Sequence, residues 1–142
     1  MFKQTKSKVI YAVSTMRFGF KYINDRRSAD GYYHSYEKRT SSSQKQYFSI
    51  LRERTWGWYS TLKNAQKCIE ENWGDIFEGT YDYALIEEIP EGVLFGGAIP
   101  KEWWFKWKGT CKKGKYILSK KPKEYDTVVC FAGRLRPRST GL

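Results

Sequence analysis

Apolar and polar positions alternate along much of the chain, which is the pattern of half-buried β-strands. In KVIYAVST (8–15), Val9, Tyr11 and Val13 fall on one side of an extended backbone and the intervening residues on the other. MRFGFKYI would continue this strand past an irregularity at Gly19. The first strand is therefore expected to begin near residue 8.

Further strand-like stretches follow at intervals. YFSILRERTWGWYS (47–60) and TYDYALIEEI (80–89) have β-type composition, and EWWFKWKGTCKKGKYIL predicts a hairpin with GTCKKG as its turn. TVVCFAG (127–133) is apolar and predicts a last strand. The polar, Ser-rich stretch 24–46 lies between the first two strands, and we expect it to be a long, mobile surface loop or hairpin insertion.

The segment 60–79 has the spacing of a helix rather than of a strand. Ser60 or Thr61 can cap its first turn, and Gly79 provides a stop. Gly74 interrupts the pattern and would divide it into two shorter helices. The apolar residues that recur every three or four positions are Leu62, Ala65, Ile69, Trp73 and Ile76.

Strands before and after one principal helix, without βαβ alternation, predict an α+β fold with a mainly antiparallel sheet. The length of 142 residues fits a single domain spanning 1–142. Its 6 Trp, 11 Tyr and 8 Phe exceed what one small core needs, which predicts aromatic side chains in a subunit interface or against a flat ligand.

The net charge of +11 is unevenly distributed. Residues 1–60 carry twelve Lys and Arg against four acids, residues 61–100 two against eight, and residues 101–142 twelve against three. This pattern suits one cationic surface for an anionic partner and one acidic element that faces it or a second copy. The alternative is that the charge serves solubility alone.

Cysteine and histidine usage argues against metal, disulfide and secretory functions. Cys68, Cys111 and Cys130 are odd in number and lack paired spacing, and the polar, basic start MFKQTKSK contains no secretory apolar region. With a single histidine, His34, and no C-x-x-C, the sequence predicts neither a metal nor a cofactor. No apolar run approaches the roughly 18 residues of a transmembrane helix.

The sequence offers no catalytic machinery. Hydrolase, metalloprotease and P-loop motifs are absent, and His34 falls in the expected loop. Glu87 and Glu88 are adjacent on a strand, so they should point to opposite faces and cannot act as a carboxylate pair. Cys68 and Cys130 are expected to pack in the core. We therefore expect a binding protein rather than an enzyme.

Aromatic residues and cations alternate in WWFKWKG (103–109). Phe105 and Trp107 share one strand face, and Lys106 and Lys108 share the other. Rings beside cations suit nucleobase stacking next to phosphate neutralisation. The alternative is that these rings belong to the core, as most buried aromatic side chains do.

Arginines alternate at two further places. Arg52 and Arg54 in RERTWGWYS share a strand face and could hold phosphates bidentately, or could simply face solvent. Arg134, Arg136 and Arg138 in GRLRPRSTG alternate in the same way after an apolar stretch, and Pro137 favours an extended backbone there. A frayed basic tail is the alternative.

The segment 54–92, RTWGWYSTLKNAQKCIEENWGDIFEGTYDYALIEEIPEG, resembles the phage anti-Thoeris sponge family, the first type of Thoeris anti-defence protein. The resemblance rests on an Arg-Thr-x-Gly-aromatic entry to the helix and on the run Ala84-Leu85-Ile86-Glu87 after it. It is strong over this middle third, weaker from 103 to 138 and absent over 16–46. Within the helix and the strand that follows it, the matching residues are Ala65, Asn72, Asp75, Ile76, Glu78, Tyr81, Tyr83, Glu91 and Gly92.

The resemblance implies a sponge, that is, a protein that binds a signal and does not cleave it. Proteins of this family sequester glycocyclic ADP-ribose signals made by bacterial TIR-domain proteins, and similar members capture cyclic oligonucleotides. It also implies a symmetric oligomer, a hexamer built from dimers, with ligand pockets between protomers. For this chain it implies diphosphate binding by Arg134 and Arg138 with Arg136 as a supporting charge, a further phosphate contact from Arg52 or Arg54, and stacking of adenine on Phe105 or Trp107.

The sequence thus predicts a cytoplasmic anti-defence protein of an infected bacterial host, with a small nucleotide signal and further copies of itself as partners. Neither a membrane nor nucleic acid is an expected partner. Two alternatives remain open: a basic nucleic-acid-binding phage protein, and a protein–protein inhibitor of a host enzyme that uses its excess Trp and Tyr as hot spots.

Overall fold

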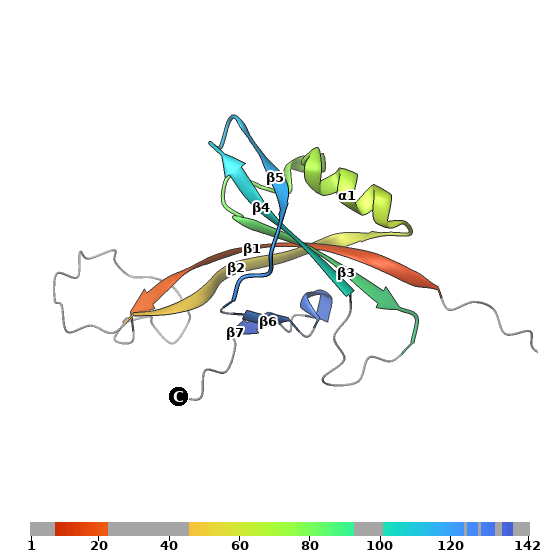
Figure 1. Cartoon of the computed structure of the whole chain (residues 1–142), viewed down its shortest axis with the longest axis horizontal. Coiled ribbons are helices and arrows are strands. Elements are labelled where there is room, and N and C mark those ends of the chain that lie inside the picture. The colour runs from red at the N-terminus through yellow and green to blue at the C-terminus, as the bar shows by residue number, and fades with distance from the viewer. Residues whose placement is uncertain are drawn as a thin grey trace, which may run out of the picture.

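The computed structural model describes residues 8–22, 46–92, 101–123, 125–127, 129–132 and 135–137. Five strands form one antiparallel sheet in the order β2-β1-β3-β4-β5, so β2 and β5 are its edges (Figure 1). This confirms a mainly antiparallel α+β architecture with one principal helix. The sheet strands are β1 (Val9–Tyr22), β2 (Gln46–Tyr59), β3 (Tyr83–Pro90), β4 (Lys101–Gly109) and β5 (Gly114–Ser119).

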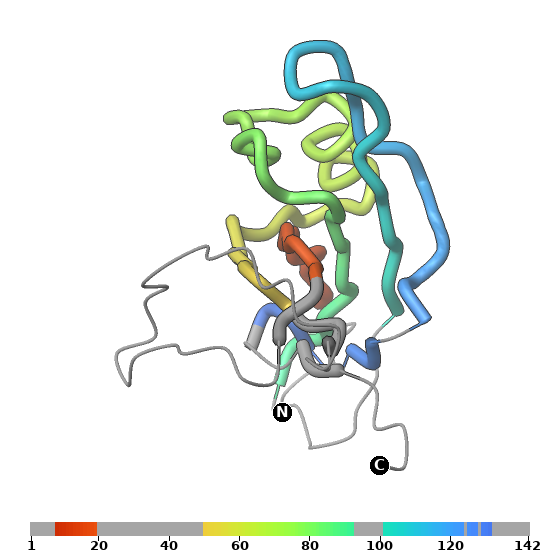
Figure 2. The backbone as a smooth tube through the Cα atoms, turned by 90° about the vertical axis from the view of Figure 1, so that its left-hand side faces the viewer, coloured from red at the N-terminus to blue at the C-terminus, as the bar shows by residue number. Residues whose placement is uncertain are grey.

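The sheet is covered on both faces. Helix α1 (Leu62–Glu70) and the 3-10 turn η1 (Trp73–Asp75) pack on one face, here called the helix face. On the other, here called the C-terminal face, lie β6 (Tyr125–Thr127), the 3-10 turn η2 (Cys130–Ala132) and β7 (Leu135–Pro137), as Figure 1 shows. In Figure 2, a view turned by 90°, the connection between β4 and β5 forms one extremity of the molecule.

Each face has its own apolar core, because the side chains of a strand point alternately to the two faces. Val13, Ile86 and Phe105 are buried under the helix. Met16, Leu85 and Trp104 are buried on the C-terminal face, where the ring of Phe18 stacks on Tyr125 at a centroid distance of 4.3 Å. The strand alternation predicted for β1, β3 and β4 is confirmed by this division.

The predicted strand from residue 8 continues to Tyr22 and pairs with β2 through two register shifts. The expected loop 24–46 falls almost entirely within 23–45, which is outside the described residues. The hairpin around GTCKKG is confirmed, with Gly109 paired to Gly114. None of the helices in the described part of the chain is long and apolar enough to cross a membrane.

The helix is shorter than the 60–79 pattern predicts. Thr61 caps it by accepting a hydrogen bond from the Asn64 backbone N–H at 3.2 Å. It ends before Asn72, which adopts a left-handed conformation (φ 51°) and uses its side-chain oxygen to accept from the Phe77 N–H at 2.9 Å. The break therefore occurs two residues before Gly74, although the division into two shorter helical pieces was predicted.

The predicted last strand over 127–133 is wrong, because residues 130–132 form a 3-10 turn. The N–H groups of Cys130 and Phe131 donate to the two carboxylate oxygens of Glu87, at 2.7 and 2.9 Å. Glu87 is completely buried on β3. A carboxylate that accepts two backbone N–H groups takes the place of a strand partner, so the chain turns where its apolar composition indicates extension.

Candidate functional site

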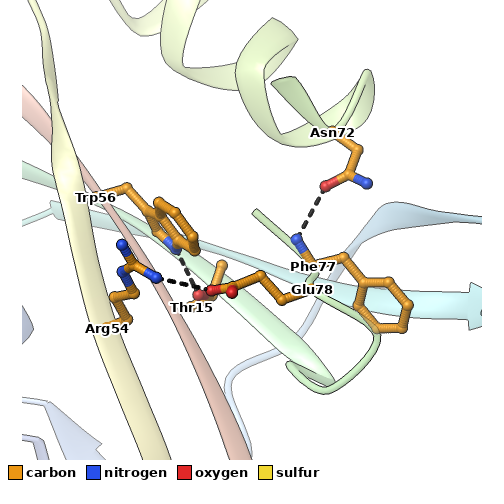
Figure 3. A network of polar contacts seen from close by, with 6 residues as sticks. All are labelled: Thr15, Arg54, Trp56, Asn72, Phe77 and Glu78. Atoms are coloured by element: carbon orange, nitrogen blue, oxygen red, sulfur yellow. Dashed lines mark hydrogen bonds and ion pairs between the residues drawn. The ribbon is translucent and has the colours of Figure 1, made fainter. Parts of the chain in front are cut away.

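The most distinctive surface lies on the helix face, where β2 extends past helix α1. Arg54 and Trp56 project from β2 on the same side, and the Arg54 guanidinium lies 3.9 Å from the Trp56 ring centroid (Figure 3). The Arg54 Nη1 atom also forms an ion pair with Glu78 Oε1 at 2.9 Å. The side chain of Arg54 is thus oriented by an aromatic ring and a carboxylate while it stays exposed to solvent.

Two more arginines extend this surface along the sheet. Arg52 is the cross-strand partner of Arg17, and its guanidinium lies 5.9 Å from the Tyr81 ring centroid. Arg17 Nη1 is 3.4 Å from the Thr80 hydroxyl. We call Arg17, Arg52 and Arg54 the arginine surface. All three are exposed, and each is oriented by a contact to the segment 78–81 or to its own strand.

Two acids, Asp82 and Glu78, border the arginine surface. Burial raises the pKa of the Asp82 carboxyl above its usual value, whereas the positive charges of Arg17 and Lys106 act in the opposite direction. Asp82 therefore neutralises part of the charge at the Arg17 end, while Glu78 does so at the Arg54 end. The surface keeps an excess of cationic groups between them.

An aromatic cavity of about 300 Å³ adjoins the arginine surface. Trp56, which contacts Arg54, forms part of its wall, and Trp73, which also lines it, remains 38% exposed. Tyr59 and Trp73 meet edge to face at a centroid distance of 5.9 Å. The residues that line the cavity are Val13, Trp56, Gly57, Trp58, Tyr59, Cys68, Trp73 and Ile76.

The cavity owes its shape to an irregularity in β2. The register shift between Val13 and Ser14 leaves Trp56 as an extra residue opposite β1, and Gly57 follows with φ 154°, a conformation that other residues rarely adopt. Such a bulge interrupts the strict alternation of faces, so Trp56 and Tyr59 both pack against the helix-face core. A regular strand would place these two side chains on opposite faces.

The polar groups of the cavity are a phenol and a thiol in contact. A hydrogen bond to Cys68, together with burial, raises the pKa of Tyr59 to about 12. Burial raises the pKa of the Cys68 thiol as well, although the Tyr59 hydrogen bond opposes this. Both groups are therefore neutral near pH 7, and the cavity can supply hydrogen bonds but no thiolate nucleophile.

The aromatic side chains predicted to stack on a ligand are engaged in packing. Phe105 is only 1% exposed beneath the helix. The Trp107 ring stacks on Phe77 at a centroid distance of 3.7 Å, and its Nε1–H donates to the Thr110 carbonyl at 3.1 Å. Both positions match the packing alternative given by the sequence. The ligand-stacking role of these rings stays a prediction.

The C-terminal arginines fall largely outside the described part of the chain. Arg134 and Arg138 are not among the described residues, and neither is His34. The backbone of Arg136 lies in β7, paired with Asp126 of β6, and its side chain is not described. The extended backbone expected around Pro137 is confirmed. Arg52 and Arg54 are the predicted site residues that the structure brings together with an aromatic cavity.

Sequence reasoning missed Trp56, Trp73 and Arg17 as site residues. Trp73 is assigned by helical spacing to the buried stripe, but it is exposed because the helix has ended before it. The usable signal was Gly57 between two tryptophans, a typical mark of a strand irregularity. Within the described residues, no group of three or more His, Cys, Asp or Glu side chains could hold a metal ion.

No protein-family model, curated protein or solved structure matches this chain.

Proposed function

We propose that this protein binds a small nucleotide signal of the glycocyclic ADP-ribose type and sequesters it without cleaving it, as a phage anti-defence protein in the cytoplasm of the infected host. The observation that carries the proposal is the arginine surface beside the aromatic cavity, joined through the contact of Arg54 with Trp56. The resemblance of residues 54–92 to anti-Thoeris sponges supports the same ligand class.

The two halves of this site suit the two halves of such a ligand. Arginine guanidinium groups bind phosphate oxygens bidentately, and Arg52 and Arg54 lie on the same face of one strand. Aromatic walls favour a flat base, which can stack on them. A volume of about 300 Å³ is at the lower end for small-molecule sites, so the cavity would accept the base while the diphosphate lies over the arginine surface.

The Arg54–Glu78 ion pair would have to open for a phosphate to bind. Both side chains are exposed, and pairs of this kind contribute only about 0–1 kcal/mol because water screens them. Hydrogen bonds between an arginine and a phosphate contribute more, about 1.5–3 kcal/mol when water is excluded. Exchange of Glu78 for a phosphate is therefore favourable, and Glu78 holds Arg54 ready in the free protein.

The chemistry of the cavity favours retention over turnover. The neutral Tyr59 hydroxyl and Cys68 thiol bond to each other, so neither is poised to attack a pyrophosphate or a glycosidic bond. A sponge needs low dissociation rates and no product release. We propose that further copies of the chain, in a symmetric homohexamer, complete the pocket from the side of edge strand β2, where the cavity lies.

The proposal is tested by incubating the protein with glycocyclic ADP-ribose, removing free ligand, and releasing bound ligand by heat for mass spectrometry. We expect intact ligand in a fixed ratio to the chain. Recovery of hydrolysed ligand would instead identify an enzyme, and recovery of none would contradict the proposal. The matched variants are Arg52→Ala with Arg54→Ala, and Lys63→Ala with Lys67→Ala on exposed positions of α1, which remove the same charge elsewhere.

A further inference from the structure

A second cationic surface lies at the far end of the β4–β5 hairpin, at the extremity of the molecule seen in Figures 1 and 2. Lys108, Lys112, Lys113 and Lys115 are all exposed there, and we call them the lysine surface. Lys108 and Lys115 are direct cross-strand partners. Because Trp107 and Tyr116 point into the helix-face core, Lys108 and Lys115 point to the opposite face.

The hairpin end that carries these lysines is rigid. The Thr110 N–H donates to the Lys113 carbonyl at 3.2 Å, and the Lys113 N–H donates to the Thr110 hydroxyl at 3.0 Å. The Trp107 indole closes the turn through its bond to the Thr110 carbonyl. Gly109 (φ 108°) leaves no room for a side chain, since a Cβ there would lie 2.3 Å from the Lys113 carbonyl oxygen. The backbone positions of these lysines are therefore fixed before any anion binds.

This rigidity holds like charges together. Directly opposed side chains on an antiparallel pair are about 5 Å apart at Cβ, and two lysines at that separation repel each other. Residues 101–123 contain nine lysines and a single acid, Glu102. Glu102 is 3.7 Å from Lys121, which also lies 3.7 Å from Asp126. Among the described residues, none of the four lysines of the lysine surface has an ion-pair partner. An external anion would relieve this repulsion.

We propose that the lysine surface binds the sugar-phosphate backbone of nucleic acid without sequence preference, as an activity separate from nucleotide sequestration. Lysine acts on phosphates as a point charge, and lysine–phosphate contacts carry no sequence information. The tryptophans of β4 are turned inward, with Trp104 3% exposed and Trp107 stacked on Phe77, so base stacking contributes nothing here.

The same geometry argues against an anionic membrane as the partner. A membrane-inserting tip carries aromatic or apolar side chains, but the turn here is Thr110-Cys111-Lys112-Lys113. The exposed apolar residues nearby, Ile117 and Leu118, are adjacent on β5 and point to opposite faces. They cannot enter a bilayer together. The lysine surface thus fits a rod of phosphates better than a lipid surface.

The test is fluorescence anisotropy with a labelled 20-base-pair duplex of mixed sequence, titrated with the full chain at several NaCl concentrations. Four phosphate contacts predict a slope of log K against log [NaCl] of about −3.6, hence a loss of affinity of about 150-fold between 50 and 200 mM salt. Lys112→Gln with Lys113→Gln should make the slope shallower by about 2. A duplex of different sequence should bind equally well.

The control is Lys63→Gln with Lys67→Gln, which removes two exposed charges from α1 and should leave the slope unchanged. If this control lowers affinity as much as the hairpin variant does, net charge alone accounts for binding and the proposal is wrong. Absence of duplex binding at 50 mM NaCl also overturns it, as does binding to phosphatidylserine vesicles without binding to the duplex. Retention of glycocyclic ADP-ribose by the hairpin variant keeps this result distinct from the proposed function.

Discussion

The arginine surface and the lysine surface are both cationic and exposed, yet the chain holds them in different ways. Each arginine contacts a ring, a hydroxyl or a carboxylate, as Arg54 does with Trp56 and Glu78. Both surfaces contain directly opposed like charges, Arg17 with Arg52 and Lys108 with Lys115. The side chains of the lysines at the hairpin end differ because, among the described residues, no carboxylate, hydroxyl or ring contacts their ammonium groups. The backbone of these lysines is ordered by the turn, and their ammonium groups are available to bind an external anion.

This difference shows what each surface can recognise. Oriented guanidinium groups beside a cavity suit one compact ligand with a defined shape, because little further ordering is needed on binding. Flexible ammonium groups on a rigid hairpin suit an extended polyanion whose phosphates can be met in several registers. The arginine surface lies on the helix face of the sheet, whereas Lys108 and Lys115 point to the opposite face. Because the two surfaces are separate, variants of one can be used to test its proposed ligand without removing the other.

The largest effect should come from the double variant Arg52→Ala with Arg54→Ala. If each arginine donates charged hydrogen bonds to the diphosphate, the combined loss is about 3–6 kcal/mol, which is at least about 100-fold in affinity. Calorimetric titration of glycocyclic ADP-ribose measures it. Duplex binding should keep its salt slope, and an equal loss in the Lys63→Ala with Lys67→Ala control would show that the arginines act only through net charge.

The second prediction concerns a buried carboxyl group, that of Glu87, rather than either cationic surface. Burial is the main cause that raises the pKa of Glu87 to about 7, with the nearby Glu102 adding to it, although the N–H groups of Cys130 and Phe131 oppose the shift. The carboxyl group of Glu87 thus binds its proton more tightly in the folded protein than in the unfolded chain. The stabilisation from Glu87 is fully present below about pH 4.5 and is lost as the pH rises through about 7.

Urea unfolding across pH 5 to 8 should therefore show a fall in the free energy of unfolding on the order of 2–3 kcal/mol. Glu87→Gln should flatten this dependence, because an amide cannot ionise. Glu88→Gln is the matched control, since Glu88 faces the other side of the strand and accepts from Tyr11. A pH dependence that survives in Glu87→Gln would assign it to another group.

The rigidity of the lysine surface can be broken without removing a single charge. Gly109→Ala introduces a Cβ against the Lys113 carbonyl at a φ of 108°, which costs about 1–3 kcal/mol of strain. We expect weaker duplex binding and lower stability by urea unfolding, with all four lysines still present. Unchanged duplex affinity in a folded variant would show that the ordering of the turn is irrelevant to binding.

The smallest effect should come from one wall of the aromatic cavity. Trp73→Ala removes a ring that lines the cavity and is 38% exposed, so we expect only a modest change in stability but a loss of about 1–2 kcal/mol in nucleotide binding from stacking. Trp73→Phe should recover part of the affinity. If both variants bind as the unmodified chain does, the base lies elsewhere than against Trp73.

Strand positions in this protein follow from sequence because alternation is a local property. The hairpin around Gly109 and the division of faces on β3 and β4 needed only neighbouring residues. The 3-10 turn at Cys130 could not be predicted in this way, because its N–H groups donate to Glu87, 43 residues away in the chain. The helix end at Asn72 is local, but it depends on one side-chain oxygen that accepts the Phe77 N–H, which apolar spacing does not indicate.

The candidate site, like the fold, could be predicted from the sequence only in part. Arginine alternation singled out Arg52 and Arg54, which lie beside the cavity, but residue spacing gave no signal for the aromatic residues Trp56 and Trp73 that line it. The stacking role predicted for Phe105 or Trp107 remains untested, and both rings pack in the helix-face core. Whether Phe105 or Trp56 is accessible depends on where the helix covers the sheet and on the bulge before Gly57. Those are properties of long-range packing, which residue spacing does not encode.

The most direct test of the central claim is calorimetric titration of glycocyclic ADP-ribose into three forms of the chain: unmodified, Arg52→Ala with Arg54→Ala, and Lys112→Gln with Lys113→Gln. We predict tight binding of intact ligand to the first and third forms, and a loss of at least about 100-fold in the second. Equal affinity in all three forms, or no heat of binding in the unmodified chain, would contradict the assignment of nucleotide sequestration to the arginine surface.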